Sequence, residues 1–465
     1  MDRLGIRWSA SQIARAILIF GLLFMLGANL PGHLSYDSLA QLSEGRSGVR
    51  ETWGPATYAW ILGFFDEIVP GTGLYVAASA AVLFFSLSTL RRLRPVVSWW
   101  AVPTILLIVL SPQFLIYQAI VWKDVLFANL TVAGFVCLAR AEISWSRPGP
   151  RWLALGSAVI CLAVASLVRQ NGIIVVPLAA LVLGILRGKD GWRQALIWGV
   201  GGLLVVLVIM QILGAATQLK SNDIRGAPGL GVRILQHYDI VGAVARDPNY
   251  PLSHIDKAAP ASAAKIRAAA ASVYSAERID FFDRDPTLGK ALWSVPKDAM
   301  NAEWRDLVTK HTGAYVVERL NVFRWLLMSP RLGVCLPQYV GVSGPDALVA
   351  KLNLTNAVDP ADVSLANYAT YFYDTPAYSH LAYAIVALFA AGFLLWRRDG
   401  ADLVIVGLLL GALAFTASFF VISIACDYRY LYFLDLAAMV GLFYLALDPS
   451  LRARTARPET RSDPV

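Results

Sequence analysis

Four short segments, far apart in the chain, combine carboxylates, cations and amides with aromatic side chains. They are Tyr36-Asp37-Ser38 with Glu44 and Arg46 after it, Trp122-Lys123-Asp124, Arg169-Gln170-Asn171 and Asp427-Tyr428-Arg429. A carboxylate can take a proton from a hydroxyl group, and fixed cations can hold a phosphate and stabilise it as a leaving group. Residues of these types could transfer a sugar from a lipid phosphate to a hydroxyl, and this chemistry needs no redox cofactor.

Each of these segments lies next to a long apolar stretch. Of the 465 residues, 57% are hydrophobic, and apolar runs of about 20 residues are long enough to cross a bilayer. The sequence therefore predicts an all-α polytopic membrane protein with about ten transmembrane helices. The expected spans are 13–30, 73–90, 96–111, 124–139, 152–168, 172–187, 194–214, 380–396, 401–424 and 431–447.

Clusters of basic residues predict the orientation of these spans. Short loops rich in Lys and Arg stay in the cytoplasm, so each cluster marks a cytoplasmic end, and both termini are expected there. The four polar segments then all lie at the opposite, outer ends. The clusters also explain the net charge of +8, so nucleic acid is not expected as a partner. They are Arg3/Arg7/Arg15, Arg91/Arg92/Arg94, Arg140/Arg147/Arg151, Arg187/Lys189/Arg193, Arg397/Arg398 and Arg452/Arg454/Arg457.

Composition divides the chain into four parts. Residues 1–214 form an N-terminal membrane module of seven spans, with a first outer loop at 31–72. Residues 215–378 are more polar and predict a mainly helical extracytoplasmic domain, with helices at 258–276 and 301–327. Residues 379–450 form a C-terminal module of three spans, and 451–465 a cytoplasmic tail. The apolar piece 56–68 is too short and too charged to span, which favours a helix lying in the membrane interface.

Several polar residues also have a structural interpretation. Asp37 could be the N-cap of the helix that follows it. Lys123, Asp124 and Arg169 could anchor their helices at the interface. Arg429 stands among three tyrosines and could be part of the same interface.

Deeper in the last span, Asp435 is expected to pair with a neighbour such as Arg429 or to line the cavity. In the outer domain, His311, Tyr315 and Arg319 have a spacing that puts them on one helix face. That face could dock the domain on the membrane part or contact an acceptor or lipid.

The four cysteines show no metal-binding spacing, and histidine is rare. Cys137 and Cys161 fall in expected spans, where cysteine is commonly a small core residue. Cys335 and Cys426 are both expected outside, where oxidation to a disulfide can occur. No cofactor is expected, and a divalent metal is left open.

The stretch 30–62 resembles the first outer loop of C-type (GT-C superfamily) integral-membrane glycosyltransferases, such as bacterial protein O-mannosyltransferases and aminoarabinose transferases. It carries Tyr36-Asp37-Ser38 and then Trp53-Gly54-Pro55-Ala56-Thr57-Tyr58. Bacterial members often have His and Pro before that helix, whereas this chain has Trp53-Gly54-Pro55. The segments 121–127, 168–172 and 427–431 are similar to further signatures of the superfamily.

The resemblance implies a polyprenyl-phosphate-linked sugar as donor, transferred with inversion to a hydroxyl of a cell-envelope glycan, lipid or protein. It implies a bacterial inner membrane protein with its active site on the periplasmic side. Asp37 would be the catalytic base or would orient the acceptor, and Lys123, Arg169 and Arg429 would hold the donor phosphate. Other substrate-binding residues are expected among Tyr36, Glu44, Arg46, Trp53, Trp122, Asp124, Gln170, Asn171, His311, Tyr315, Arg319 and Asp427.

Three other classes of function stay open. A transporter or lipid flippase would need charged groups along a path through the membrane midplane. A non-catalytic membrane scaffold would need no deep cavity. A ligase using a diphosphate-linked glycan, or a phosphotransferase acting on lipid head groups, would need the same cations.

Overall fold

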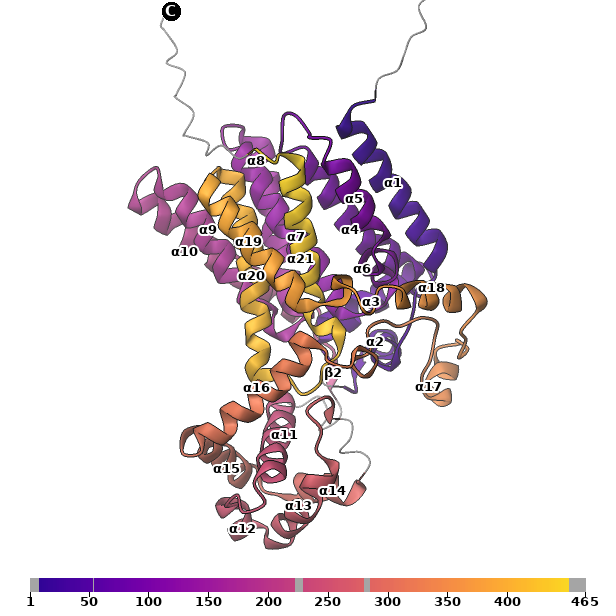
Figure 1. Ribbon diagram of the computed structural model, residues 1–465, viewed down its shortest axis with the longest axis vertical. Helices are drawn as coiled ribbons and strands as arrows, with labels where there is room; N and C mark the ends of the chain where they lie inside the picture. The colour runs from indigo at the N-terminus through magenta and orange to yellow at the C-terminus, as the bar shows by residue number, and fades with distance from the viewer. Residues whose placement is uncertain (1–7, 53, 222–228, 280–284, 451–465) are drawn as a thin grey trace, which may run out of the picture.

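Long apolar helices form the body of the protein, as Figure 1 shows for the computed structural model. The structure describes residues 8–52, 54–221, 229–279 and 285–450. Within these ranges nine helical segments are long and apolar enough to cross a membrane. The chain is therefore an all-α multi-pass membrane protein, as the sequence predicts. The segments are α1 (Ala10–Asn29), α4 (Gly73–Arg91), α7 (Lys123–Ile143), α8 (Pro148–Val168), η2 (Gln170–Ile174) with α9 (Val175–Gly188), α10 (Trp192–Ala216), α19 (His380–Arg397), α20 (Gly400–Ile422), and η7 (Tyr428–Leu431) with α21 (Tyr432–Leu447).

A bent pair of helices takes the place of the expected third span. Helix α5 (Ala101–Leu110) has ten residues, and the chain then turns by 64° into α6 (Pro112–Leu115) and η1 (Tyr117–Ala119). Pro112 lacks the backbone N–H that would continue α5. The segment 112–122 is mostly buried, and His33 N donates to Ala119 O at 2.9 Å.

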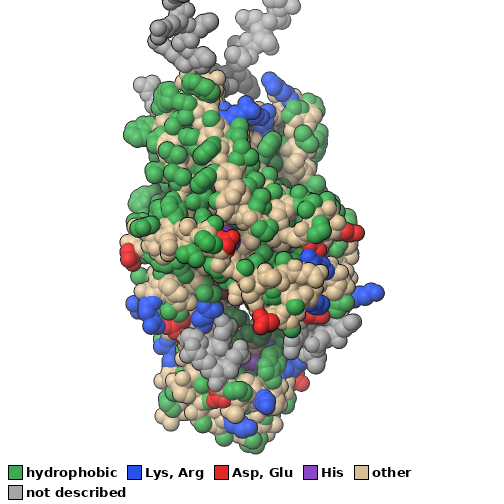
Figure 2. Space-filling model, turned by 90° about the vertical axis from the view of Figure 1, so that its right-hand side faces the viewer, with side chains coloured by type: hydrophobic (Ala, Val, Ile, Leu, Met, Phe, Trp, Pro, Cys, Tyr) green, Lys and Arg blue, Asp and Glu red, His purple; other side chains and the backbone are tan. Residues whose placement is uncertain are grey.

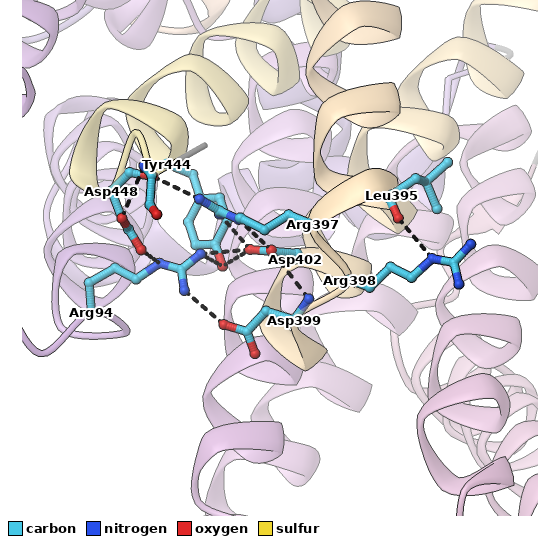
Figure 3. A network of polar contacts seen from close by, with 9 residues as sticks. Arg94, Leu395, Arg397, Arg398, Asp399, Asp402, Tyr444 and Asp448 are labelled. Carbon is cyan, nitrogen blue, oxygen red and sulfur yellow. Dashed lines mark hydrogen bonds and ion pairs between the residues drawn. The ribbon is translucent and has the colours of Figure 1, made fainter. Parts of the chain in front are cut away.

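The basic clusters of the described chain share one end of the bundle, where α1 begins and α21 ends (Figure 1). We call this the basic end. A buried network of ion pairs holds it together (Figure 3). Arg94, just after α4, contacts Asp402 of α20 at 2.6 Å and Asp399 at 2.8 Å. Arg397 donates to both carboxylate oxygens of Asp402, at 2.6 and 2.7 Å. The network therefore joins the N-terminal and C-terminal membrane modules.

The first outer loop folds into two crossed helices at the opposite end. Helix α3 (Ala56–Ile68) has the bounds that the sequence predicts, and α2 (Tyr36–Ser47) precedes it. Gly45 and Gly63 mark the crossing, since a Cβ on Gly45 would lie 2.7 Å from Gly63 N, and one on Gly63 would lie 2.6 Å from Gly45 O. The close crossing fixes α2 on α3. The connecting strand β1 (Val49–Arg50) pairs with β2 (Lys220–Ser221).

A separate group of helices lies below the bundle in Figure 1 and has its own apolar core. We call it the helical lobe, residues 230–328. The expected helix 301–327 is two helices, broken around Lys310 and His311. The lobe contains α11 (Leu230–Arg246), α12 (Ser253–Ala258), α13 (Pro260–Val273), α14 (Pro286–Ser294), α15 (Lys297–Thr309) and α16 (Thr312–Met328).

Residues 329–378 lead back to the bundle. They contain α17 (Asp346–Lys351) and α18 (Pro360–Thr370), and α17 packs against α2. Cys335 in this segment forms a disulfide with Cys426, which follows α20. Cys426 N also donates to Glu277 O of the helical lobe at 2.8 Å. The disulfide therefore lies where the bundle, the lobe and the returning segment meet.

Candidate active site

The polar segments converge at the end of the bundle opposite the basic end. There, a cavity of about 800 Å³ lies between the bundle and the helical lobe. Figure 2 shows a hollow at this level, with charged side chains around it and an apolar bundle surface beyond. Of the residues that we singled out in the sequence, Tyr36, Asp37, Trp122, Asp427 and Arg429 line the cavity.

Asp37 projects into this cavity from the first turn of α2. The N-cap of α2 is Ser35, whose backbone N–H donates to Ser38 Oγ at 3.2 Å. Our expectation that Asp37 caps this helix is therefore wrong, and its side chain, 45% exposed, is left to face the cavity. Burial alone would raise the pKa of the Asp37 carboxyl, but Arg429 and Lys123 together hold that pKa below its usual value. Asp37 is thus ionised at neutral pH.

Arg429 connects Asp37 to the rest of the polar lining. Its Nη2 atom lies 2.6 Å from Asp37 Oδ2 and 3.1 Å from Asp427 Oδ2. The guanidinium also lies over the ring of Trp122, 4.9 Å from the centroid. Trp122 in turn donates from Nε1 to Ser35 Oγ at 2.9 Å. The start of α2, the start of α7 and η7 are therefore joined at one point.

A second ion pair lies behind this lining. Arg169 pairs with Asp124, and both side chains are buried. The Arg169 guanidinium lies 5.4 Å from the ring centroid of Tyr430, which lines the cavity. Asn171 donates to Ser418 Oγ at 3.1 Å, and Gln170 is exposed. Arg169 thus lies behind the cavity wall. Lys123 does not line the cavity either, although its charge helps to lower the pKa of Asp37.

Two candidates in the first outer loop shape that loop. Glu44 is buried and accepts from the backbone N–H groups of Glu51 and Thr52 at 2.8 and 2.5 Å. Arg46 pairs with Asp66 at 2.7 Å, which ties α2 to the end of α3. Neither side chain lines the cavity. Trp53 lies outside the described residues.

The three candidates of the helical lobe also lie outside the cavity lining. Arg319 pairs with Asp239 and donates to Ser423 O at 2.7 Å, beyond the end of α20. His311 is the N-cap of α16 and packs against Tyr250, and Tyr315 packs against Trp304. Arg319 therefore docks the lobe on the bundle, as the structural interpretation expects.

The structure adds lining residues that we did not single out. His237 of α11, Trp293 of α14 and Arg278 come from the helical lobe, and Tyr339 comes from the returning segment. Arg278 reaches Asp427 at 3.7 Å and so crosses from the lobe to the bundle. No motif marks these positions, because they come together only when the lobe docks.

Asp435, in α21, has a different partner from the one expected. Its carboxylate contacts His380 Nδ1 at 2.8 Å, and both side chains are fully buried. The ring of Tyr428 lies against His380 with 4.0 Å between centroids. Asp435 therefore does not pair with Arg429. Its partner His380 packs against Tyr428, the residue before Arg429.

Among the residues that the structure describes, no three His, Cys, Asp or Glu side chains gather in a way that could hold a metal ion. The question of a metal stays where the sequence leaves it.

No family model matches the sequence, and no curated protein matches it. Two solved structures of the Archaeoglobus fulgidus oligosaccharyltransferase are similar to this chain. One shows the enzyme, AglB, in complex with an inhibitory peptide and a dolichol-phosphate; it is 13% identical with a TM-score of 0.39, and the match covers 93% of this chain and 50% of that one. The other, in complex with Zn and sulfate, is 14% identical with a TM-score of 0.42, and the match covers 93% and 48%.

This chain thus spans about half the length of those enzymes. Because both TM-scores are low, we base the functional proposal on the residues of the cavity.

Proposed function

We propose that the chain is a membrane glycosyltransferase that moves a sugar from a polyprenyl-phosphate donor to a hydroxyl of a glycan, lipid or protein. The observation that carries this proposal is the position of Asp37. Its carboxylate is half exposed in a cavity of about 800 Å³, while Arg429 keeps it ionised. An ionised carboxylate open to a cavity of ligand size is suited to act as a general base.

In the proposed reaction, Asp37 takes the proton of the acceptor hydroxyl as its oxygen bonds to the anomeric carbon. The bond between that carbon and the donor phosphate oxygen breaks, and the electron pair leaves with the phosphate. The leaving polyprenyl phosphate gains negative charge, which Arg429, Lys123 and Arg278 would stabilise. A single displacement of this kind inverts the configuration at the anomeric carbon.

The place of the cavity fits a donor that is anchored in a membrane. A polyprenyl phosphate carries its phosphate at the bilayer surface and its chain in the apolar layer. The cavity lies at one end of the apolar bundle, between the bundle and the helical lobe. A phosphate entering from the bilayer would therefore meet Asp37 and Arg429 at its own depth.

Two observations support an extracytoplasmic site. The basic clusters lie at the end opposite the cavity, and such clusters stay cytoplasmic. The Cys335–Cys426 bond lies directly beside Asp427, and disulfides persist in oxidising compartments.

The flippase alternative has less support. Buried ionisable side chains of the described bundle pair with each other, Asp435 with His380 towards the cavity end and Asp402 with Arg397 at the basic end. Groups paired in this way do not form the open polar path that transport requires.

The test is the Asp37→Asn variant, purified in detergent. Wild-type protein is incubated with undecaprenyl-phosphate-linked glucose, mannose, galactose or arabinose and envelope extract, and released undecaprenyl phosphate is measured by mass spectrometry. We expect Asp37→Asn to lower the transfer rate by about 100-fold or more, the usual contribution of a general base.

The matched control is Asp298→Asn, which removes an exposed carboxylate on α15. It should transfer at the wild-type rate, and thermal melting should show that both variants fold. Full activity of Asp37→Asn would exclude the proposed base. A parallel reaction with undecaprenyl-diphosphate-linked sugars separates a ligase from the proposed enzyme.

A further inference from the structure

One wall of the cavity is formed by the helical lobe and carries a large aromatic side chain. Trp293, near the end of α14, is 47% exposed although it lines the cavity. The preceding residue, Leu292, is buried in the core of the lobe. An aromatic side chain that is open to a cavity of ligand size is a typical contact for a bound ligand.

The indole ring is held in place by its neighbours. Arg233 of α11 lies 4.9 Å from the ring centroid and donates to the carbonyl oxygens of Trp293 and Val295 at 2.9 and 2.8 Å. The ring of His237 meets the indole nearly at a right angle, 4.8 Å between centroids. A ring fixed in this way loses little conformational entropy when a ligand packs on it.

The rest of the cavity lining offers hydrogen-bonding groups of both kinds. Asp37 and Asp427 can accept hydrogen bonds, and Arg278 and Arg429 can donate them. A flat aromatic surface opposite such groups matches the chemistry of a sugar ring. One face of a pyranose presents C–H groups that pack on an aromatic ring, and its hydroxyls point outward from the edge.

We propose that Trp293, with His237 beside it, forms a saccharide-binding subsite in which a sugar ring stacks on the indole. The identity of that sugar as a substrate rests on the proposed function, but the binding does not. The sugar could belong to the lipid-linked donor or to the acceptor. Either sugar would present the C–H face of its ring to Trp293, and the kinetic experiment below distinguishes the two sources.

Saturation-transfer NMR of the full-length protein in detergent tests the subsite directly. The probes are the methyl glycosides of glucose, galactose, mannose and arabinose. We expect at least one glycoside to receive saturation mainly at the C–H protons of one ring face. Trp293→Ala and Trp293→Leu should reduce this transfer at least tenfold, whereas Trp293→Tyr, which keeps a flat ring, should retain most of it.

The matched control is Tyr371→Ala, which removes an aromatic side chain that is 82% exposed and lies outside the cavity lining. It should bind the glycoside as the wild type does. If no glycoside receives saturation, or if Trp293→Leu and the wild type give the same spectrum, the subsite is excluded, whatever the transfer activity.

Kinetics then identify the source of the sugar. A rise in KM for the acceptor at unchanged kcat in Trp293→Leu assigns the subsite to the acceptor, and a rise in KM for the lipid-linked sugar assigns it to the donor. Glycoside binding in a protein that transfers no sugar would support the subsite and reject the glycosyltransferase proposal, so the two can fail separately.

Discussion

At the scale of single residues, the ion pair between Asp37 and Arg429 determines the state of the cavity. The two residues are 392 positions apart in the chain and meet at 2.6 Å. Arg429 holds the carboxylate in its charged form and is itself shared with Asp427. A proton acceptor and a cation are therefore available side by side.

Loss of this pair should change the pH dependence of transfer. In Arg429→Gln, burial acts on Asp37 with less opposition, so the pKa of Asp37 should rise. Because its pKa is lowered, Asp37 in the wild type stays ionised and able to act as a base until the pH falls to the folded-state pKa. The stabilisation from its ion pair is lost as the pH falls through that value. The acid limb of the rate profile should therefore move to higher pH in the variant, together with a lower maximal rate.

The control for this profile is Arg267→Gln, which breaks an ion pair with Asp256 on the helical lobe, outside the cavity. Its acid limb should coincide with that of the wild type. An unchanged limb in Arg429→Gln would show that Arg429 does not set the charge of Asp37.

Residue types and charge segregation were enough to select Asp37, Trp122, Asp427 and Arg429 as members of one cluster. They could not tell which cation faces the cavity. Arg169 and Arg429 look alike in the sequence, and only packing shows that Arg169 is engaged by Asp124 behind the wall. They also gave no sign of Trp293, one of 14 tryptophans.

At the scale of elements, the crossing of α2 and α3 positions Asp37. Gly45→Ala would place a Cβ 2.7 Å from Gly63 N, so the two helices would have to separate. Overpacking of this kind costs about 1–3 kcal/mol. We expect a lower melting temperature in detergent and a lower transfer rate, because Asp37 would shift with α2.

Gly27→Ala in α1 is the control, since a Cβ at Gly27 would have open space around it, with nothing within 4 Å. It should melt at or above the wild-type temperature, because alanine favours the helix. If Gly45→Ala melted like Gly27→Ala, the close crossing would not be a constraint.

Apolar runs predicted the helical elements well where the pattern was local. The bounds of α3 follow from one apolar piece and its flanking charges. The bend after α5 and the break before α16 were missed, although Pro112 was a visible signal for the first. No proline marks the second, which lies at Lys310 and His311.

At the scale of the whole molecule, the ion-pair network of the basic end joins the two membrane modules. Asp402→Asn should lower the stability by about 3–5 kcal/mol, because Arg397 and Arg94 would stay buried with their main partner gone. The measurement is the loss of the folded fraction on heating in detergent.

Asp399→Asn is the comparison, since Asp399 is 32% exposed and asparagine can also cap α20. Its effect should be below about 1 kcal/mol, because water reaches Asp399 and Arg94 keeps Asp402 as a partner. Equal losses of stability in both variants would show that the buried carboxylate of Asp402 contributes no more than that of Asp399.

The separation of basic clusters and polar segments to opposite ends of the bundle could be predicted, because the two kinds of segment alternate along the chain. Which end faces the cytoplasm stays a prediction. The docking of the helical lobe over the cavity was beyond the reach of the sequence. That docking depends on contacts such as Arg278 with Asp427, whose partners carry no pairing signal in a single sequence.

The network in Figure 3 has a mechanical consequence. Arg94, Arg397 and Asp402 join helices of both membrane modules at the basic end, so the helices cannot separate easily there. We expect any widening that admits a bulky lipid to occur at the cavity end instead, where the Asp37–Arg429 ion pair is partly exposed and could open. Pairs of spin labels should then give a broad distance distribution at the cavity end and a narrow one at the basic end. Equal breadths at both ends would contradict this expectation.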